Sequence, residues 1–495
     1  MQSGVKELLK MAKVLLGTTS DKEAERFLLK WVKTTPFRGR TFTVGGYVRD
    51  EVLGLDAKDL DVVVEMKGGA EKLTAMLHQF FPTQTSTPRI MGRGYPIWQI
   101  VFKEDIEFQG DTFATGGAVI EFVDTQKETV PDQNSRQRVV EYAPLKDDIE
   151  RRYFTVNMLL KDLTTGEIVD LTGTSLKDIQ DGVLRGHPGV DFDRILREDP
   201  LRMIRLVRFQ VKYGWNVPMS VLKAVRRNAA RIEIVSGERI QGELVKVMDL
   251  GKLAQAIRFM KAVGLLKYVF PEIQAMQGVE HEYSKGHHQE GDVLRHTLLV
   301  LQNAKPGVDS QLAALLHDVG KPASQEVMDG LIRFIGHEKV GGEIAEAIMR
   351  RLKFDLDTVK RVRTMVENHM RPHHLTRDEG VGPSALRRFI REVGAELVDA
   401  VLDLAEADSL GTMPPTNMIP DLRREIDALR VPVQNAETLP VDGRDIQRIL
   451  GIGPGKKIGD ILKWLKDKAF EMVQAGEEMT KDRAESLIIE HFRET

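Results

Sequence analysis

The chain of 495 residues contains no cysteine. Disulfide bonds, thiolate nucleophiles and cysteine-ligated zinc are therefore excluded, which leaves histidine and carboxylate side chains as candidate metal ligands. No apolar run reaches the roughly 20 residues that a helix needs to cross a bilayer. Met1–Gly17 has the pattern of an amphipathic helix without the features of a cleaved leader. These absences predict a cytoplasmic protein with no membrane partner.

A strong charge of one sign is also absent, since the formal net charge is −3. The positive charges are nevertheless concentrated: between Arg194 and Arg231 there are ten lysines and arginines against two acids, a local net charge of +8. A basic stripe of this kind could neutralise the phosphates of an RNA strand. The alternative is an ordinary solvated helix face.

Strand-like and helix-like patterns are unevenly distributed along the chain. Runs typical of strands occur at Thr41–Val44, Leu60–Glu65, Trp98–Phe102 and Val119–Val123, and from about residue 190 the pattern is almost wholly helical. Apolar residues make up 42% of the chain and charged residues 29%. This composition predicts a soluble α+β protein of about two to four domains, in which a sheet-and-helix head precedes helical domains.

The most informative motif is Val44-Gly-Gly-Tyr-Val-Arg-Asp50, followed by Asp59-Leu-Asp61. Gly45 and Gly46 permit a tight turn, and a helix opening at Tyr47 would direct its free N–H groups at an anion. Residues two apart on a strand share one face, so Asp59 and Asp61 could bind the same hard cation. A triphosphate beside Mg²⁺ is the arrangement required for nucleotidyl transfer. Either motif alone is also compatible with a solvated turn and surface acids.

In this order the two motifs resemble those of the class II nucleotidyltransferases, the bacterial-type CCA-adding tRNA nucleotidyltransferases and their poly(A) polymerase relatives. The resemblance implies a polymerase β-like head and identifies Arg49 as a nucleotide-binding residue. It also implies that Glu121 completes a two-metal Mg²⁺ site with the two aspartates. The family usually has an arginine five residues after that acid, whereas this chain has Gln126, with Lys127 next to it.

The segment Asp148-Ile-Glu-Arg-Arg-Tyr-Phe-Thr-Val-Asn157 is similar to the family motif D-L-x-R-R-D-F-T-I-N-A. The resemblance implies that Arg151, Arg152 and Asn157 bind the nucleotide, the arginines through the triphosphate oxygens. Tyr153 stands where the family has an aspartate associated with ribose recognition. Selectivity for ribose over deoxyribose is therefore left open.

Residues 197–209 are similar to the family helix E-D-x-x-R…R-x-x-R-F. Cytosine and adenine both present an acceptor nitrogen beside an amino donor, which an Arg202 donor next to an Asp199 acceptor would match. At i,i+3 on one helix, these two side chains are expected to hold each other in place. The resemblance adds Arg205 and Arg208 to the nucleotide site. The alternative for Asp199 and Arg202 is a local ion pair. Ser236-Gly-Glu-Arg-Ile also resembles a family segment.

Histidines gather in a later part of the chain. His296, the dipeptide His317-Asp318, His337 and Asp408 look like the ligand set of an HD-type metal-dependent phosphohydrolase. Imidazole and carboxylate ligands suit a divalent transition metal such as Mn²⁺ or Ni²⁺. In CCA-adding enzymes with an HD domain, the resemblance implies hydrolysis of phosphates or cyclic phosphates at RNA 3′ ends. His288 and His369 are further candidate ligands.

Together these patterns predict a template-independent enzyme that adds C and A to tRNA 3′ ends from CTP and ATP, without an obligate protein partner. A poly(A) polymerase and a partial CC- or A-adding enzyme are alternatives. An HD phosphohydrolase whose inactive head only binds RNA is an alternative of another class. The predicted domains are a nucleotidyltransferase head at 1–165, a helical neck with nucleotide-selecting and RNA-binding helices at 166–275, an HD domain at 276–415 and a helical tail at 416–495.

Overall fold

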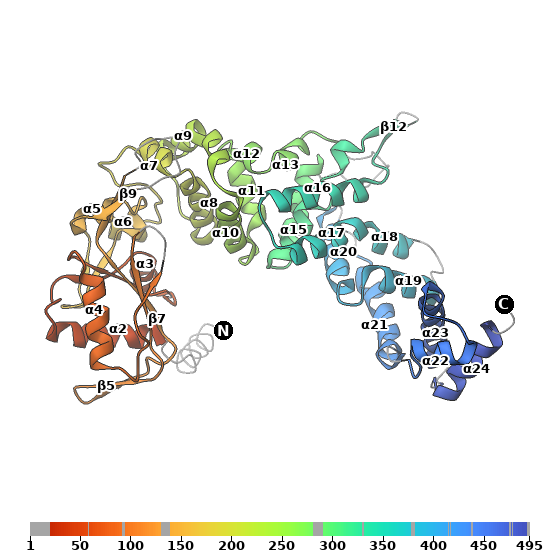
Figure 1. Cartoon of the computed structure of the whole chain (residues 1–495). Coiled ribbons are helices and arrows are strands. Elements are labelled where there is room, and N and C mark those ends of the chain that lie inside the picture. The colour runs from red at the N-terminus through yellow and green to blue at the C-terminus, as the bar shows by residue number, and fades with distance from the viewer. Residues whose placement is uncertain are drawn as a thin grey trace, which may run out of the picture. The chain divides into compact units, whose positions relative to one another are not determined.

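The structure is a computed structural model of the whole chain (Figure 1). It divides into two compact units, one formed by Met1–Val247 with Gln255–Val269 and the other by Met248–Ala254 with Phe270–Thr495. No helix among its described residues is long and apolar enough to cross a bilayer. Those described residues are 20–57, 59–91, 95–129, 139–280, 291–328, 331–377, 382–413, 415, 417–436, 439–474, 477 and 479–492.

The head of the first unit is built on a seven-stranded sheet with the order β11-β10-β1-β2-β7-β4-β3. The predicted α+β class is confirmed, and each of the four predicted strands is present within two residues of its expected ends. β2 and β7 pair in parallel, whereas the other neighbours are antiparallel. The strands are β1 (Thr41–Val44), β2 (Asp61–Val64), β3 (Arg89–Met91), β4 (Ile97–Val101), β7 (Val119–Asp124), β10 (Leu160–Asp162) and β11 (Ile168–Val169).

An aromatic cluster forms the main core of the head. Phe27 of α2 (Ser20–Trp31) is at its centre, with the rings of Trp31, Phe81, Phe102, Phe108 and Phe113 at centroid distances of 5.2 to 6.0 Å. Aromatic contacts of this kind, stacked for Trp31 and edge to face for the others, add to the free energy gained from burial. The remaining head elements are α3 (Gly46–Val52), α4 (Gly69–Phe80), α5 (Leu145–Glu150), α6 (Ser175–Gln180) and the two-stranded ribbons β5–β6 (Ile106–Phe108, Asp111–Phe113) and β8–β9 (Gln126–Thr129, Val139–Tyr142).

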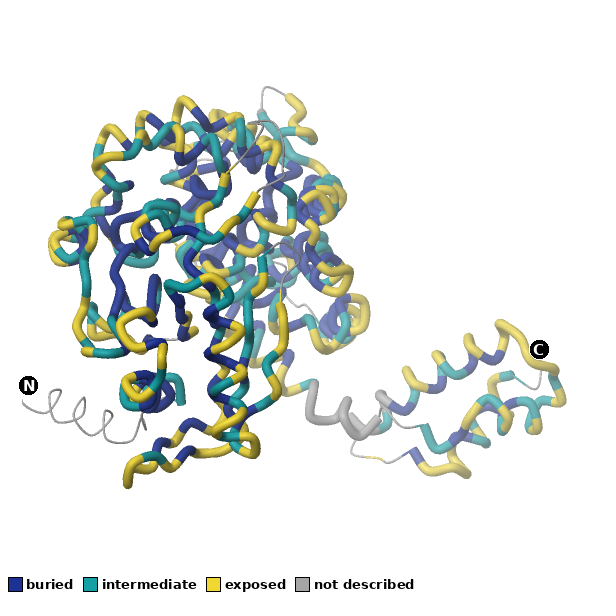
Figure 2. Tube along the Cα trace, turned by 60° about the vertical axis from the view of Figure 1, so that its left-hand side comes forward, coloured by how far each residue is buried: buried dark blue, intermediate teal, exposed yellow. Residues whose placement is uncertain are grey.

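Helices follow the head, as the sequence predicts. Figure 2 shows exposed and buried positions alternating along them, as expected for helices with one face on a core. α8 ends at Gly214, whose φ of 71° is the left-handed conformation that commonly closes a helix. The helices are α7 (Phe192–Glu198), α8 (Leu201–Tyr213), α9 (Met219–Asn228), α10 (Gly237–Met248), α11 (Leu253–Ala262) and α12 (Leu266–Val269).

The second unit is also helical, apart from a short hairpin, β12–β13 (Glu326–Met328, Leu331–Arg333), that the sequence did not indicate. Its tail helices enclose a small core of their own, which includes Ile446, Ile461 and Ile488. The helices are α13 (Pro271–Ala275), α14 (Val293–Asn303), α15 (Val308–Leu316), α16 (His337–Arg351), α17 (Leu356–Asn368), α18 (Met370–Arg377), α19 (Pro383–Val393), α20 (Val398–Gly411), α21 (Ile419–Ala436), α22 (Gly443–Leu450), α23 (Lys456–Gln474) and α24 (Lys481–Phe492).

A buried ionic group joins three elements of the head. Lys161 of β10 lies 2.9 Å from Glu25 of α2 and 2.7 Å from Glu51 of α3, and the Thr43 hydroxyl donates to Glu25 at 3.2 Å. Burial raises the pKa of Glu25, and the ammonium group of Lys161 opposes this shift. Because the side chains of Lys161 and Glu25 are shielded from water, each depends on the other for compensation of its charge.

Replacing Lys161 with methionine should lower the free energy of unfolding of the head by about 3 kcal/mol, because the Glu25 carboxylate would be left buried without its cation. Urea denaturation measures this loss. The exposed pair Lys177–Asp181 supplies the control, since Lys177→Met should change the stability little. Adding Glu25→Gln to Lys161→Met should restore part of the loss; equal losses for Lys161→Met and Lys177→Met would contradict this interpretation.

Candidate functional site

One cavity of the first unit, with a volume of about 330 Å³, contains most of the residues predicted for the head. It brings together every residue predicted from the sequence to bind the nucleotide, and one of the three predicted carboxylates, Asp61. The lining residues are Gly45, Gly46, Arg49, Asp61, Glu128, Arg151, Arg152, Tyr153, Asn157, Asp199, Arg202, Arg205, Arg208 and Phe209.

The glycine turn forms one wall of this cavity. Gly45 has a φ of 73°, which glycine adopts without strain, and α3 begins at Gly46, one residue before the predicted start. A Cβ atom at position 45 would lie 3.2 Å from Nη1 of Arg152. Behind the turn, Arg49 donates to Asn157 at 2.5 Å, and its guanidinium group lies over the Phe209 ring. The glycine turn therefore leaves room for Arg152, and the contacts behind the turn hold Arg49 in a fixed direction.

The predicted carboxylates lie on two neighbouring strands and the turn before them. Asp61 and Glu121 are register partners in the parallel pair β2–β7, so their side chains project from the same face of the sheet. Asp59 does not belong to β2, because its φ of 61° is left-handed and the strand starts at Asp61. The expected alternation along one strand is thus wrong for Asp59, which is placed by a turn that aspartate tolerates.

The charges of these acids affect one another. Asp61 lines the cavity, and the protein around it raises its pKa to about 6. Withdrawal of water is the largest cause of this shift, Glu121 and Asp59 add to it, and Arg152 opposes it. Carboxylate oxygens are the ligands that hard divalent ions such as Mg²⁺ prefer, so the chemistry of these three side chains suits such an ion.

Asp148 holds the two arginines of the third motif. It is fully buried and accepts hydrogen bonds from Arg151 at 2.9 Å and from Arg152 at 3.0 and 2.9 Å. Burial alone would raise the pKa of Asp148, but the two guanidinium groups outweigh burial and lower it. The backbone N–H of Gln126 also donates to Asp148, at 3.1 Å. Lys127 forms an ion pair with Glu141 across β8–β9 at 2.9 Å and does not line the cavity.

Asp199 and Arg202 both line the cavity, although not on one helix as predicted. Asp199 directly follows the last residue of α7, and α8 begins only after Pro200. Asp199 accepts a hydrogen bond from Arg239 of α10 at 2.9 Å, whereas Arg202 donates to the carbonyl oxygen of Ile195 at 2.8 Å. Asp199 and Arg202 are therefore each held by a different group. The sequence did not single out Arg239, although its segment had been noticed as similar to the family.

A second residue of α10 holds the other two arginines of α8. Glu243 is buried and lies 2.8 Å from Nε of Arg205 and 2.6 Å from Nε of Arg208. Both arginines line the cavity together with Arg202. α10 thus fixes one acid and two cations of the site, through Arg239 and Glu243 respectively.

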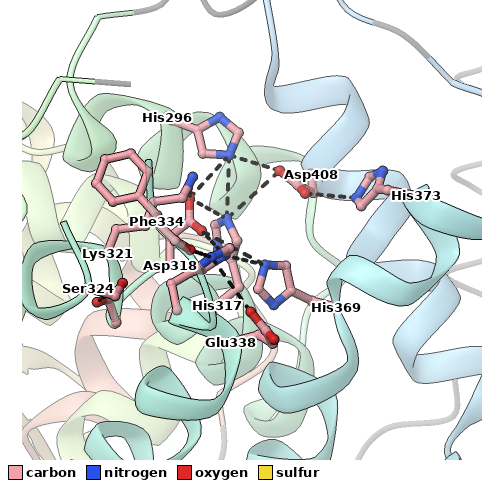
Figure 3. A network of polar contacts seen from close by, with 12 residues as sticks. His296, His317, Asp318, Lys321, Ser324, Phe334, Glu338, His369, His373 and Asp408 are labelled. Carbon is pink, nitrogen blue, oxygen red and sulfur yellow. Dashed lines mark hydrogen bonds and ion pairs between the residues drawn. The ribbon is translucent and has the colours of Figure 1, made fainter. Parts of the chain in front are cut away.

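The second unit contains two groups of buried metal-ligand side chains (Figure 3). His296, His317 and Asp408 form one group, and Asp318, His337 and His369 form the other; within each group the ligand atoms lie within 4.8 Å of one another. Asp318 lies between the groups, with Oδ2 at 3.2 Å from Nε2 of His317 and Oδ1 at 3.3 Å from Nε2 of His337. Its two oxygens therefore face different groups.

The histidine rings are oriented for metal binding by backbone contacts. Nδ1 lies 3.0 Å from the Ala314 carbonyl in His317, 2.8 Å from the Phe334 carbonyl in His337 and 2.7 Å from the Val366 carbonyl in His369. Since a carbonyl oxygen only accepts, each Nδ1 carries a proton, and Nε2 is the ring nitrogen that faces the centre. Burial, together with the neighbouring histidines, lowers the pKa of His369 to about 3, which keeps this ring neutral. This donor set fits transition-metal ions.

Helix packing assembles these ligands from distant positions. His296 belongs to α14, His317 and Asp318 follow α15, and His337 is the first residue of α16. Gly320 allows this approach, since a Cβ there would lie 2.1 Å from the carbonyl oxygen of His337. The ligand positions predicted from the sequence all meet at this centre.

Two additional histidines belong to the centre. His369, noted from the sequence only as a further candidate, completes the second group, and His373 lies 2.9 Å from Asp408. His373 was missed, although its spacing of four residues from His369 was a usable signal. His288 lies outside the described residues.

Three family descriptions match successive parts of the chain. They are the poly A polymerase head domain over residues 41–185, a probable RNA- and SrmB-binding site of polymerase A over residues 216–277, and an HD domain over residues 293–413. The match to the head domain includes the glycine turn, the carboxylates and the Asp148 motif, and the HD match includes both metal-ligand groups.

Individual relatives agree with these descriptions. The chain is 30% identical over 455 residues to the A-adding tRNA nucleotidyltransferase of Deinococcus radiodurans, covering 87% of this chain and 92% of the relative. It is 29% identical over 369 residues to the CC-adding tRNA nucleotidyltransferase of Thermus thermophilus, covering 71% and 80%. The crystal structure of the Bacillus stearothermophilus CCA-adding enzyme in complex with CTP shares the fold, with a TM-score of 0.65, 19% identity and coverage of 96% and 98%.

We expect the second unit to retain about two transition-metal ions, one for each ligand group. His369→Ala should remove about one of them, and Asp318→Asn should weaken both, because Asp318 faces both groups. Elemental analysis after loading with Mn²⁺ and gel filtration would count the ions, in an Asp61→Asn background that disables the head. His491→Ala, in the tail, is the control. Unchanged stoichiometry in His369→Ala would remove this ring from the ligand set.

Proposed function

Because the chain belongs to the family of tRNA nucleotidyltransferases with a poly(A) polymerase head domain, we propose that it adds C and A nucleotides to tRNA 3′ ends from CTP and ATP. The observation that carries the proposal is the single cavity in which the glycine turn, Asp61, the arginines and Asp199 meet. Such a cavity offers cationic donors for a triphosphate and an acceptor–donor combination for a base edge, so nucleotide choice needs no nucleic-acid template.

The roles in the proposed reaction follow from the charges and supports of the side chains. Arg49, Arg151 and Arg152 bind triphosphate oxygens, and because each is held by an acid or an amide, little conformational freedom is lost on binding. Two Mg²⁺ ions, held by Asp59, Asp61 and Glu121, would activate the RNA 3′-hydroxyl and neutralise the pyrophosphate leaving group.

Base selection is assigned to Asp199 and Arg202. The Asp199 carboxylate accepts the exocyclic amino group of cytosine or adenine, and Arg202 donates to the adjacent ring nitrogen. Uracil and guanine present the opposite polarity, so an acceptor would face the Asp199 carboxylate and a donor would face Arg202, which is costly. Arg239 orients the Asp199 carboxylate for this role.

The HD centre supports a second proposed activity, hydrolysis of phosphates or cyclic phosphates at RNA ends. A transition metal held by the two ligand groups would supply an activated water. Lys321 lies 2.7 Å from Asp318 and adds a cation beside the centre, suited to an anionic substrate. Removal of a damaging phosphate would prepare an RNA end for nucleotide addition in the head.

One comparison favours a narrower alternative. Two of the relatives add only part of the CCA sequence by name, one being A-adding and the other CC-adding. Extension of a tRNA that lacks its CCA end, read at single-nucleotide resolution with each NTP alone and with all four, separates the possibilities. Addition of C, C and A followed by arrest supports the full activity, whereas two C or one A identifies a partial enzyme. A long A tail would move the assignment to poly(A) polymerase.

Asp59→Ala should abolish nucleotide addition, by at least about a thousandfold, and leave phosphate hydrolysis unchanged. His317→Ala should abolish hydrolysis and leave addition unchanged. Both activities are measured on the same RNA, with labelled CTP and with a 3′-phosphorylated end.

If Asp59→Ala changed neither activity, the head would be only an RNA-binding module attached to a phosphohydrolase. Loss of both activities in each variant would instead indicate unfolding, which circular dichroism checks.

The pH dependence of nucleotide addition at limiting Mg²⁺ should report on Asp61. Its pKa of about 6 means that the carboxyl is protonated below pH 6 and ionised above it, so addition should rise with pH and fall about tenfold per unit below the midpoint. Because protons and Mg²⁺ compete for the same oxygens, a higher Mg²⁺ concentration should move the midpoint to lower pH. The same profile is expected for His317→Ala. A midpoint independent of Mg²⁺ would assign the profile to another group.

A further inference from the structure

Tyr153 occupies a strained position in the wall of the nucleotide cavity. Its φ is 57°, and the N–H of Phe154 donates to the carbonyl oxygen of Arg152 at 2.7 Å, which closes a tight turn around Tyr153. A bulky residue rarely adopts this conformation, and it persists only where surrounding structure enforces it. The buried Phe154 ring, at 4.8 Å from that of Tyr153, anchors the turn. The strain is thus concentrated where the Tyr153 side chain reaches the cavity.

The Tyr153 side chain contacts two of the arginines of α8. Arg205 donates to its hydroxyl oxygen at 2.7 Å, and the Arg205 guanidinium group is also bound by Glu243. On the ring face, the guanidinium carbon of Arg202 lies 4.8 Å from the centroid, within the range of a cation–π contact. Glu243, Arg205, Tyr153 and Arg202 therefore form a continuous series of contacts that ends at a residue assigned to base selection.

A tyrosine supports these arginines differently from an acid. An aspartate at position 153 would form ion pairs and neutralise positive charge in the cavity, whereas a phenol and its ring orient the guanidinium groups and leave their charge available. Contact with the ring also restricts the positions open to the Arg202 guanidinium group. Arg202 then presents its N–H groups in a fixed direction, which is what discrimination between base edges requires.

We propose that Tyr153 is a positioning residue that sets nucleotide discrimination by orienting Arg202, with Arg205 and Glu243 as its anchor. The proposal rests on the proposed nucleotidyl transfer and adds a specificity determinant to the same cavity. It implies that Tyr153 contributes more to the ratio between correct and incorrect nucleotides than to the rate of the reaction.

The test compares Tyr153→Phe, which keeps the ring and removes the Arg205 hydrogen bond, with Tyr153→Asn, which tolerates the left-handed turn and removes the ring. Equilibrium binding of CTP, UTP, ATP and GTP is measured alongside kcat and KM for addition. The preference for CTP over UTP, or for ATP over GTP, should fall roughly threefold to tenfold in Tyr153→Phe and further in Tyr153→Asn. KM for the correct nucleotide should rise more than kcat falls.

Tyr268→Phe is the matched control, since Tyr268 of α12 does not line the cavity. A merely structural role for Tyr153 would lower thermal stability and weaken all four nucleotides equally, so unchanged ratios in both Tyr153 variants overturn the inference. If the wild-type protein binds CTP and ATP selectively but adds neither, the proposed activity is wrong while the binding ratios still test Tyr153. Binding of no nucleotide overturns both.

Discussion

Repulsion between like charges is the constraint on which the nucleotide cavity depends. Six arginines line a space of about 330 Å³, and without compensation their guanidinium groups would turn outward to water. Buried acids prevent this: Asp148 holds two of them and Glu243 holds two others. Because these acids are shielded from solvent, their attraction to the arginines is weakly screened. The cavity thus keeps six arginines close together in a defined geometry.

One of the compensating acids comes from an element outside the catalytic motifs. Glu243 belongs to α10, whereas the arginines that it holds belong to α8, and Asp148 belongs to α5. The cavity is therefore complete only when the helices that follow the head are folded beside it. A helix that supplies no predicted substrate contact controls both the charge and the orientation of the residues that do. The packing of α10 therefore determines which charged groups the cavity presents.

The HD centre also depends on compensation of buried charge, but there the crowded charged groups are acids. Asp318 and Asp408 are buried acids surrounded by imidazole rings, and these interactions lower the pKa of both carboxyl groups well below the usual value although burial alone would raise it. Nδ1 of His317, His337 and His369 faces a backbone carbonyl, so Nε2 of each ring is turned toward the acid oxygens. A divalent cation there would balance two acids, as the acids of the head balance arginines.

The motifs themselves were readable from the sequence, because glycine turns, paired acids and the His-Asp dipeptide are contiguous and depend on local chemistry. Tertiary structure decided which element each residue belongs to: Asp59 precedes its strand and Asp199 follows a helix, so arguments from strand or helix spacing did not apply to them. It also decided which distant residues complete the sites: Arg239 meets Asp199, and His369 and His373 join the HD centre. Residues far apart in sequence meet only through packing, and packing is a property of the whole fold.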